Sequence, residues 1–160
     1  MIQGDITQQK VDAIVNAANT GLRGGGGVDG AIHRAAGPQL DIACRKLNGC
    51  KTGQAKTTPG FNLPAKYIIH TPGPVWRNGN HGEASLLASC YRQCLIQAQD
   101  HYCQSIAFPS ISTGIYGFPL NKAVQIAIKT VKDFEPKCHV IFVCFDAVTY
   151  RTYQKALGDD

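Results

Sequence analysis

Four consecutive glycines and the three residues after them carry the clearest chemical signal in the sequence. The run is Gly24, Gly25, Gly26, Gly27, Val28, Asp29 and Gly30. Glycines let backbone N–H groups approach an anion closely, and a helix starting behind them adds unsatisfied donors and the positive end of its dipole. This combination predicts a cradle for the diphosphate of a nucleotide-like ligand. A flexible interdomain linker is the alternative, but this run lies between a predicted buried strand and a predicted helix.

Two named phosphate-binding motifs do not account for this loop. A P-loop requires Gly-Lys-Ser/Thr at the start of the helix, which is absent from this run. A dinucleotide fingerprint is formally present as Gly25, Gly27 and Gly30, but it expects a second strand ending in Asp or Glu about twenty residues later. The chain there, residues 45–50, is predicted to end a helix and turn, so we reject this motif.

A second loop has the composition of a phosphate-binding turn. Small hydroxyls and glycines of this kind can wrap a diphosphate with backbone N–H groups. A tyrosine ring in the same loop can lie against a sugar. An ordinary turn before the helix at Pro119 is the alternative, and the pairing with the first glycine loop favours binding. The residues are Ser112, Thr113, Gly114, Ile115, Tyr116 and Gly117.

Three polar side chains, Asn16, Asn19 and Asp29, lie nearest the first loop. Each has a structural alternative, since asparagines close turns at strand ends and Asp29 stands where an N-cap belongs. A carboxylate beside a bound phosphate would repel it unless the carboxylate faced a sugar hydroxyl or a water. Asp29 is therefore a candidate base, or orienting group, for a water molecule.

Two histidines are close to these elements. His33 follows Asp29 by four residues, one helical turn, so it can pair with Asp29 or support a sugar pocket, with a structural role as the alternative. His70 is expected to be a hydrogen-bonded residue of the core. The cysteines and histidines do not have the spacing of zinc ligands, and we predict neither a metal nor a cofactor.

Asp5 and Phe145 are the candidates for contacts to a base. Asp5 lies in a turn before the first predicted strand, where it can accept a hydrogen bond from an adenine amino group or simply close the turn. Phe145 ends the last apolar run and can stack on a base. A core position is the alternative for Phe145.

Apolar runs alternate with helical patterns along the chain. This order predicts one α/β domain over residues 1–160, a three-layer α/β/α sandwich with a mixed, mostly parallel central sheet. Both candidate loops leave strand ends, so we expect them at the same rim of the sheet. We predict strands over 13–15, 55–58, 67–71, 105–108 and 140–145, and helices over 28–36, from 38, 83–101, 120–131 and 149–157.

Composition narrows the class of protein. The chain has 160 residues, 44% of them hydrophobic and 17% charged, with 16 basic against 11 acidic residues. This suits a folded protein with an anionic ligand. Because the basic residues do not form a block, nucleic acid binding is not indicated. The seven cysteines form no C-x-x-C pair, and no signal peptide or membrane span is recognisable, so we expect a cytoplasmic protein and a monomer.

The motifs together resemble the macrodomain family. The matching segments are Gly4–Thr7, Val15–Asn19, Gly24–His33, Ile69–Trp76 and Ile111–Gly117. They are most similar to the MacroD-type subgroup, particularly its bacterial O-acetyl-ADP-ribose deacetylases. The combination of Asn19 with Gly-Gly-Val-Asp-Gly separates the hydrolytic members from macrodomains that only bind. The family usually has a further strand before Gly4, and here residues 1–3 imply a shortened edge strand or a truncated start.

The resemblance implies ADP-ribose as the ligand and assigns a task to each position. Asp29 would orient or activate the attacking water. The other implied contacts are Asp5 and Ile6 with adenine, Phe145 near it, Gly24 to Val28 and Ser112 to Tyr116 around the diphosphate, and Asn16, Asn19 and Tyr116 at the distal ribose.

The same resemblance implies the reaction. Water would hydrolyse an ester on the distal ribose, releasing acetate from O-acetyl-ADP-ribose. Removal of single ADP-ribose units from acidic side chains of proteins is the same ester chemistry with a larger leaving group. The alternative is a non-catalytic module that binds ADP-ribose.

Overall fold

A six-stranded sheet forms the centre of the computed structural model, which describes residues 2–158. The strand order is β1-β6-β5-β2-β4-β3, and only β3 runs antiparallel to its neighbour. The strands are β1 (Ile2–Gln3), β2 (Ala13–Ala18), β3 (Lys56–Pro59), β4 (Tyr67–Pro72), β5 (Ser105–Phe108) and β6 (His139–Cys144). The predicted mixed, mostly parallel sheet is confirmed.

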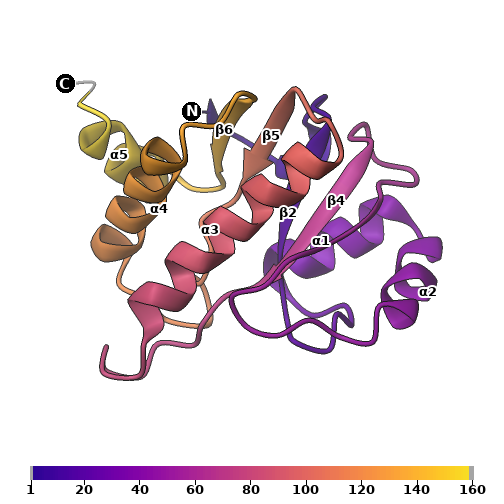
Figure 1. Cartoon of the computed structure of the whole chain (residues 1–160), viewed down its shortest axis with the longest axis horizontal. Helices are drawn as coiled ribbons and strands as arrows, with labels where there is room; N and C mark the ends of the chain where they lie inside the picture. The colour runs from indigo at the N-terminus through magenta and orange to yellow at the C-terminus, as the bar shows by residue number, and fades with distance from the viewer. Residues whose placement is uncertain (1, 159–160) are drawn as a thin grey trace.

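Helices cover both faces of this sheet. Figure 1 shows α3, α4 and α5 gathered over one face and α1 and α2 over the other. The helices are η1 (Ile6–Gln8), α1 (Gly27–Ala36), α2 (Gln39–Lys46), α3 (Glu83–Asp100), α4 (Leu120–Phe134) and α5 (Ala147–Ala156). The predicted three-layer sandwich is therefore confirmed. No helix within residues 2–158 is long and apolar enough to cross a membrane.

The central strand β2 explains why two cores form. Its residues alternate between the faces, so Ala13 and Val15 join the core under α3 and α4, while Ile14 and Ala18 join the core under α1 and α2. Both faces are buried, as expected for a parallel strand between helical layers. Asn16 is the polar exception in this strand and has no exposed surface.

The end of β6 differs from the prediction. The strand stops at Cys144, and Phe145 is 82% exposed, so the interpretation of Phe145 as a core aromatic was wrong. The reason is local: the Asp146 carboxylate accepts the Thr149 backbone N–H at 2.7 Å and starts α5 at Ala147. At the opposite end of the chain, β1 is two residues long and pairs with β6.

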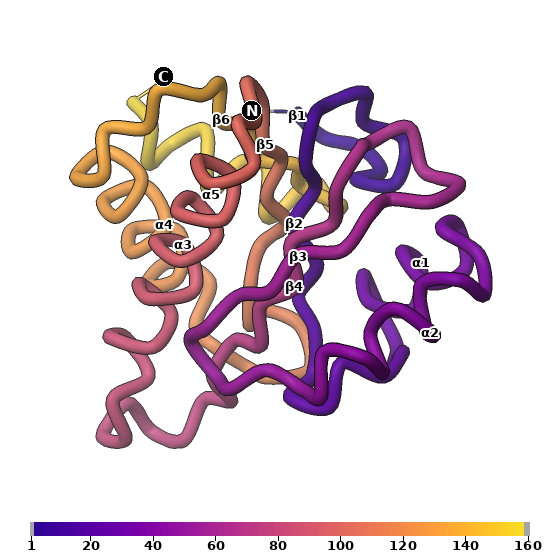
Figure 2. The backbone as a smooth tube through the Cα atoms, turned by 45° about the vertical axis from the view of Figure 1, so that its right-hand side comes forward, coloured from indigo at the N-terminus to yellow at the C-terminus, as the bar shows by residue number. Residues whose placement is uncertain are grey.

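The topology brings the two candidate loops together. β2 and β5 are parallel neighbours, so their carboxyl ends meet at one edge of the sheet. The chain leaves β2 into the glycine run and leaves β5 into the Ser112 loop. In the tube view of Figure 2 both loops lie at the lower edge of the sheet, below the labels of β2 and β4.

Candidate active site

A cavity of about 230 Å³ lies between the two loops. Residues of both loops form its walls, as their position at one sheet edge predicts. The predicted residues that line it are Asn19, Gly25, Gly26, Gly27, Val28, Asp29, Ser112, Gly114, Ile115 and Tyr116. The other predicted residues, Asp5, Ile6, Asn16, Gly24, His33, Thr113 and Phe145, lie outside this lining.

Glycine serves two different purposes in the first loop. A Cβ built on Gly26 would meet no atom within 4 Å, so this position is open toward the cavity. Gly27 has a φ of 58°, in the region that favours glycine. A Cβ on Gly30 would instead collide with the carbonyl oxygen of Gly25, so Gly30 lets the loop fold onto α1.

Asp29 lies in the first turn of α1, three residues after the N-cap Gly26. The structural alternative, in which Asp29 caps the helix, does not hold, because the N-cap is Gly26 and α1 begins at Gly27. The side chain turns inward: its Oδ1 accepts a hydrogen bond from the Asn16 Nδ2 at 2.8 Å, and only 8% of it is exposed. Burial raises the pKa of Asp29, and hydrogen bonding from Asn16, the charge of His33 and the Gly25 N–H partly offset that rise.

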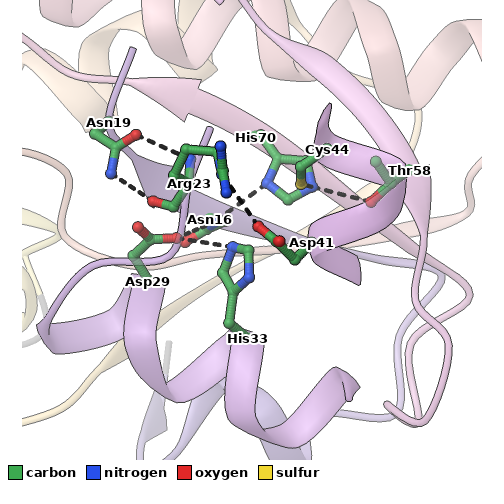
Figure 3. Close-up of polar contacts among 9 residues, drawn as sticks. All are labelled: Asn16, Asn19, Arg23, Asp29, His33, Asp41, Cys44, Thr58 and His70. Atoms are coloured by element: carbon green, nitrogen blue, oxygen red, sulfur yellow. Dashed lines mark hydrogen bonds and ion pairs between the residues drawn. The ribbon is translucent and has the colours of Figure 1, made fainter. Parts of the chain in front are cut away.

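His33 contacts this carboxylate directly, and His70 contacts the Asn16 amide that is bonded to it (Figure 3). The His33 Nε2 lies 3.4 Å from the Asp29 Oδ1, so the predicted pairing across one helical turn is present. His70 is fully buried, and its Nδ1 lies 3.1 Å from the Asn16 Nδ2. The prediction that His70 is a hydrogen-bonded core residue is confirmed.

Asn19 closes the turn that precedes the glycines. Its Nδ2 donates to the Arg23 carbonyl at 2.5 Å, and its Oδ1 accepts the Arg23 backbone N–H at 3.1 Å. This is the turn-closing arrangement considered for asparagines at strand ends. Because Asn19 also lines the cavity, the same turn holds its amide at the wall of the site.

The second loop is held mainly by backbone hydrogen bonds. The Trp76 N–H donates to the Tyr116 carbonyl at 2.8 Å, and the Phe118 N–H donates to the Ser112 carbonyl at 2.9 Å. Ser112 adopts a φ of 67°, and its buried Oγ finds no hydrogen-bond partner among residues 2–158. At the rim, the Ile115 side chain is 94% exposed.

At the adenine end of the predicted site, Asp5 and Ile6 have structural contacts. The Asp5 Oδ1 accepts from the Thr7 backbone N–H at 2.9 Å and from its hydroxyl at 2.6 Å, which caps η1. Ile6 is packed into the core under α1 and α2. Phe145 is exposed, so its ring is available for stacking.

The sequence model of the Macro domain family matches residues 15–127. The chain belongs to this family. A macro domain-containing protein of Chlorobaculum tepidum is 62% identical to this macrodomain, covering 98% of this chain and 94% of the relative. An O-acetyl-ADP-ribose deacetylase of Salmonella newport is 55% identical, covering 100% of this chain and 96% of the relative.

Solved macrodomains have the same structure. The Oceanobacillus iheyensis macrodomain with ADP superposes with a TM-score of 0.92 at 44% identity, covering 98% of this chain and 88% of that one. The Trypanosoma brucei macrodomain in complex with ADP-ribose superposes with a TM-score of 0.90 at 44% identity, covering 98% and 67%. The expected resemblance to macrodomains is confirmed.

Sequence reasoning missed four residues that line the cavity of this macrodomain: Ala17, Ala18, Gly73 and Ser110. Gly73 has the clearest structural reason, because a Cβ there would collide with the Ser112 Oγ and a methyl of Ile111. The segment 72–74 looked like a simple strand stop. A glycine between two prolines was the available signal for a close approach of backbone.

The Cys44 thiol, which lies outside the cavity lining, has the properties of a structural cysteine. Cys44, which packs against His70, is buried, and burial raises the pKa of its thiol to about 11. A protonated thiol is a poor nucleophile. Within residues 2–158, no group of three or more His, Cys, Asp or Glu side chains is arranged to hold a metal ion. Among the residues of this range that line the cavity, Asp29 carries the one carboxylate.

Proposed function

We propose that this macrodomain is an ester hydrolase that converts O-acetyl-ADP-ribose to ADP-ribose and acetate. The observation that carries the proposal is the position of Asp29. Its carboxylate lines a cavity shared by two loops of phosphate-binding composition, and buried side chains hold it from behind. The deacetylase names of the Salmonella relatives and the ADP-ribose complex of the Trypanosoma brucei macrodomain support the same conclusion.

In this proposal, the diphosphate lies between the loops and is bound mainly by backbone donors. Residues 24–28 contribute the N-terminus of α1, and residues 112–116 contribute the second face. Asn19 and Tyr116 then border the distal ribose. Asp5, Ile6 and Phe145 are assigned to the adenine end.

The reaction requires one water and one proton acceptor. The water oxygen attacks the acetyl carbonyl carbon as its proton passes to the Asp29 carboxylate. The tetrahedral intermediate collapses, the bond to the ribose oxygen breaks, and that oxygen takes the proton from Asp29 to become the free hydroxyl, which regenerates the carboxylate. A carboxylate whose pKa is raised by burial is a better base near neutral pH than an exposed aspartate.

The same site can act on single ADP-ribose units attached to acidic side chains of proteins. That linkage is also an ester on the distal ribose, so the water and Asp29 have the same task. The exposed Ile115 at the rim supports this extension, because the second loop presents a surface to a larger leaving group.

The test is acetate release from O-acetyl-ADP-ribose by the wild-type chain, with ADP-ribose affinity measured by calorimetry on the same preparation. Release that is lost in Asp29→Asn, an isosteric variant, supports the hydrolase. Binding of ADP-ribose without release would instead identify a non-catalytic reader. A protein carrying mono-ADP-ribose on glutamate serves as second substrate, and ADP-ribose release from it tests the extension separately.

A further inference from the structure

A line of buried polar side chains crosses the sheet beneath the cavity. Asn16 on β2 and His70 on β4 are direct partners in the parallel register, and neither has any exposed surface. Ile14 and Ile68, two residues before them in each strand, belong to the core under α1 and α2. Asn16 and His70 therefore point into this apolar layer, where a polar group is costly unless it is hydrogen-bonded.

The hydrogen bonds among these buried side chains determine which of their atoms donate and which accept. The Asn16 Nδ2 has two N–H groups, directed at the Asp29 Oδ1 at 2.8 Å and the His70 Nδ1 at 3.1 Å. An amide nitrogen only donates, so the His70 Nδ1 must accept and its proton must reside on Nε2. The Nε2–H then donates to the Thr58 Oγ1 at 2.9 Å on the neighbouring strand β3 (Figure 3).

This arrangement selects one orientation of the Asn16 amide. If the amide were reversed, its oxygen would face the Asp29 carboxylate, which is a repulsive contact, and the His70 Nδ1 would have to carry the proton. A charged His70 would also disrupt the arrangement, since its Nδ1 would become a donor. Burial, with a smaller effect from His33, lowers the pKa of His70 to about 3, so the ring stays a neutral acceptor at physiological pH.

We propose that His70 is a positioning residue for hydrolysis: by accepting from Asn16 it fixes the amide that holds the Asp29 carboxylate toward the cavity. The inference rests on the proposed function, in which Asp29 handles the proton of the attacking water. His70 does not line the cavity, so it acts through Asn16. Thr58 extends the line by fixing the ring tautomer from the far side.

Other groups also contact Asp29 and His70, and they limit the loss of activity expected when the His70 acceptor is removed. His33 lies 3.4 Å from the Asp29 Oδ1, the Gly25 N–H faces the same carboxylate, and the Cys44 Sγ lies 3.9 Å from the His70 Nε2. Losing the His70 acceptor thus removes one of several restraints on Asp29. We expect a reduced kcat with the ligand still bound, not a loss of binding.

The first test compares two variants of equal shape, His70→Leu and His70→Asn. Both leave the same space, but only the Asn side chain places an acceptor near the position of Nδ1. By comparison with outer-shell partners of metal ligands, we expect kcat for acetate release to fall about tenfold in His70→Leu and to stay within about threefold of wild type in His70→Asn. The ADP-ribose dissociation constant should change little in either. Equal loss of kcat in both variants, with normal binding, would overturn the proposal.

The second test acts from the edge strand and disturbs the core less. Thr58→Val removes the partner of Nε2, so the tautomer with a proton on Nδ1 becomes accessible and no longer accepts from Asn16. Thr58→Ser keeps the hydroxyl and is the control. We expect kcat to fall in Thr58→Val and to be retained in Thr58→Ser. This pair decides the question even if His70→Leu fails to fold.

The pKa of Asp29 tests the positioning role of His70 independently of the proposed hydrolase function. The Asn16 N–H lowers the pKa of Asp29, so weakening that bond should raise the Asp29 pKa, measured from its carboxyl carbon by NMR, in Thr58→Val but not in Thr58→Ser. If wild type releases no acetate, the proposed function fails, while this pKa shift still tests the positioning. An unchanged Asp29 pKa in Thr58→Val would overturn the inference.

Discussion

The two loops of the cavity are supported by different kinds of side chain. Beneath the glycine loop lie the buried polar side chains Asn16, Asp29 and His70, joined by hydrogen bonds. Beneath the Ser112 loop lie aromatic rings: Trp76 packs on Phe118 with centroids 4.8 Å apart, and Tyr91 packs on Phe108 at 5.0 Å.

The proposed function gives the two loops different tasks. A reacting carboxylate must be fixed to within a fraction of an ångström, and directional hydrogen bonds provide that precision. A loop that presents only backbone N–H groups needs a firm shape, which close packing and backbone hydrogen bonds provide. We therefore expect substitutions of the polar side chains beneath the glycine loop to change chemistry, and substitutions that disturb the packing beneath the Ser112 loop to change stability.

Gly26→Glu should have the largest effect, loss of ADP-ribose binding and hence of turnover. The position is open in the fold, so the protein should stay folded while the side chain blocks the cavity and its charge repels the diphosphate. Calorimetry with ADP-ribose checks this, with Gly26→Ala as control. Retained micromolar affinity in Gly26→Glu would mean that the glycine run is not the cradle.

Asp29→Asn should lower kcat by roughly a thousandfold, within the range for loss of a general base. The amide has the same shape, so ADP-ribose affinity should stay within about tenfold, roughly 1.4 kcal/mol. Acetate release and calorimetry on one preparation measure both. A parallel loss of binding and turnover would place Asp29 in binding and not in catalysis.

The pH profile of kcat should show an acid limb above the pKa of an ordinary aspartate. Burial raises the pKa of Asp29, and the base acts only when deprotonated, so kcat should fall about tenfold per unit as pH drops below that raised value. The limb should vanish from the residual activity of Asp29→Asn. A limb unchanged by that variant would point to another titrating group.

Gly73→Ala tests the packing beneath the Ser112 loop and should act on stability. The added Cβ would collide with the Ser112 Oγ and a methyl of Ile111, and overpacking of this kind costs about 1–3 kcal/mol. Urea denaturation measures the free energy of unfolding. Gly114→Ala is the matched control in the loop itself, because a Cβ there meets nothing within 4 Å.

Ser112→Ala should have the smallest effect, within about 0.5 kcal/mol on the free energy of unfolding. The Ser112 Oγ is buried without a partner in residues 2–158, so its removal gives up no hydrogen bond within that range. ADP-ribose affinity should also be nearly unchanged if this loop binds through its backbone. A large loss of affinity would show that the hydroxyl contacts the ligand directly.

Short-range sequence patterns were sufficient to predict many structural features of this macrodomain. The glycine run, the alternation of strands and helices and the four-residue spacing of Asp29 and His33 are short-range features, and each appears in the structure as predicted. Local rules did not hold where they competed with packing. Phe145 follows an apolar strand but lies outside it, and Asp29 looks like a cap but turns inward.

The sequence by itself determined the two loops, the order of the elements and the presence of a carboxylate beside the glycines. Only the tertiary structure decided that Asn16 and His70, 54 residues apart, stand side by side beneath that carboxylate. Their contact depends on the register of two parallel strands. Packing of the whole core sets that register, and no short-range pattern encodes it.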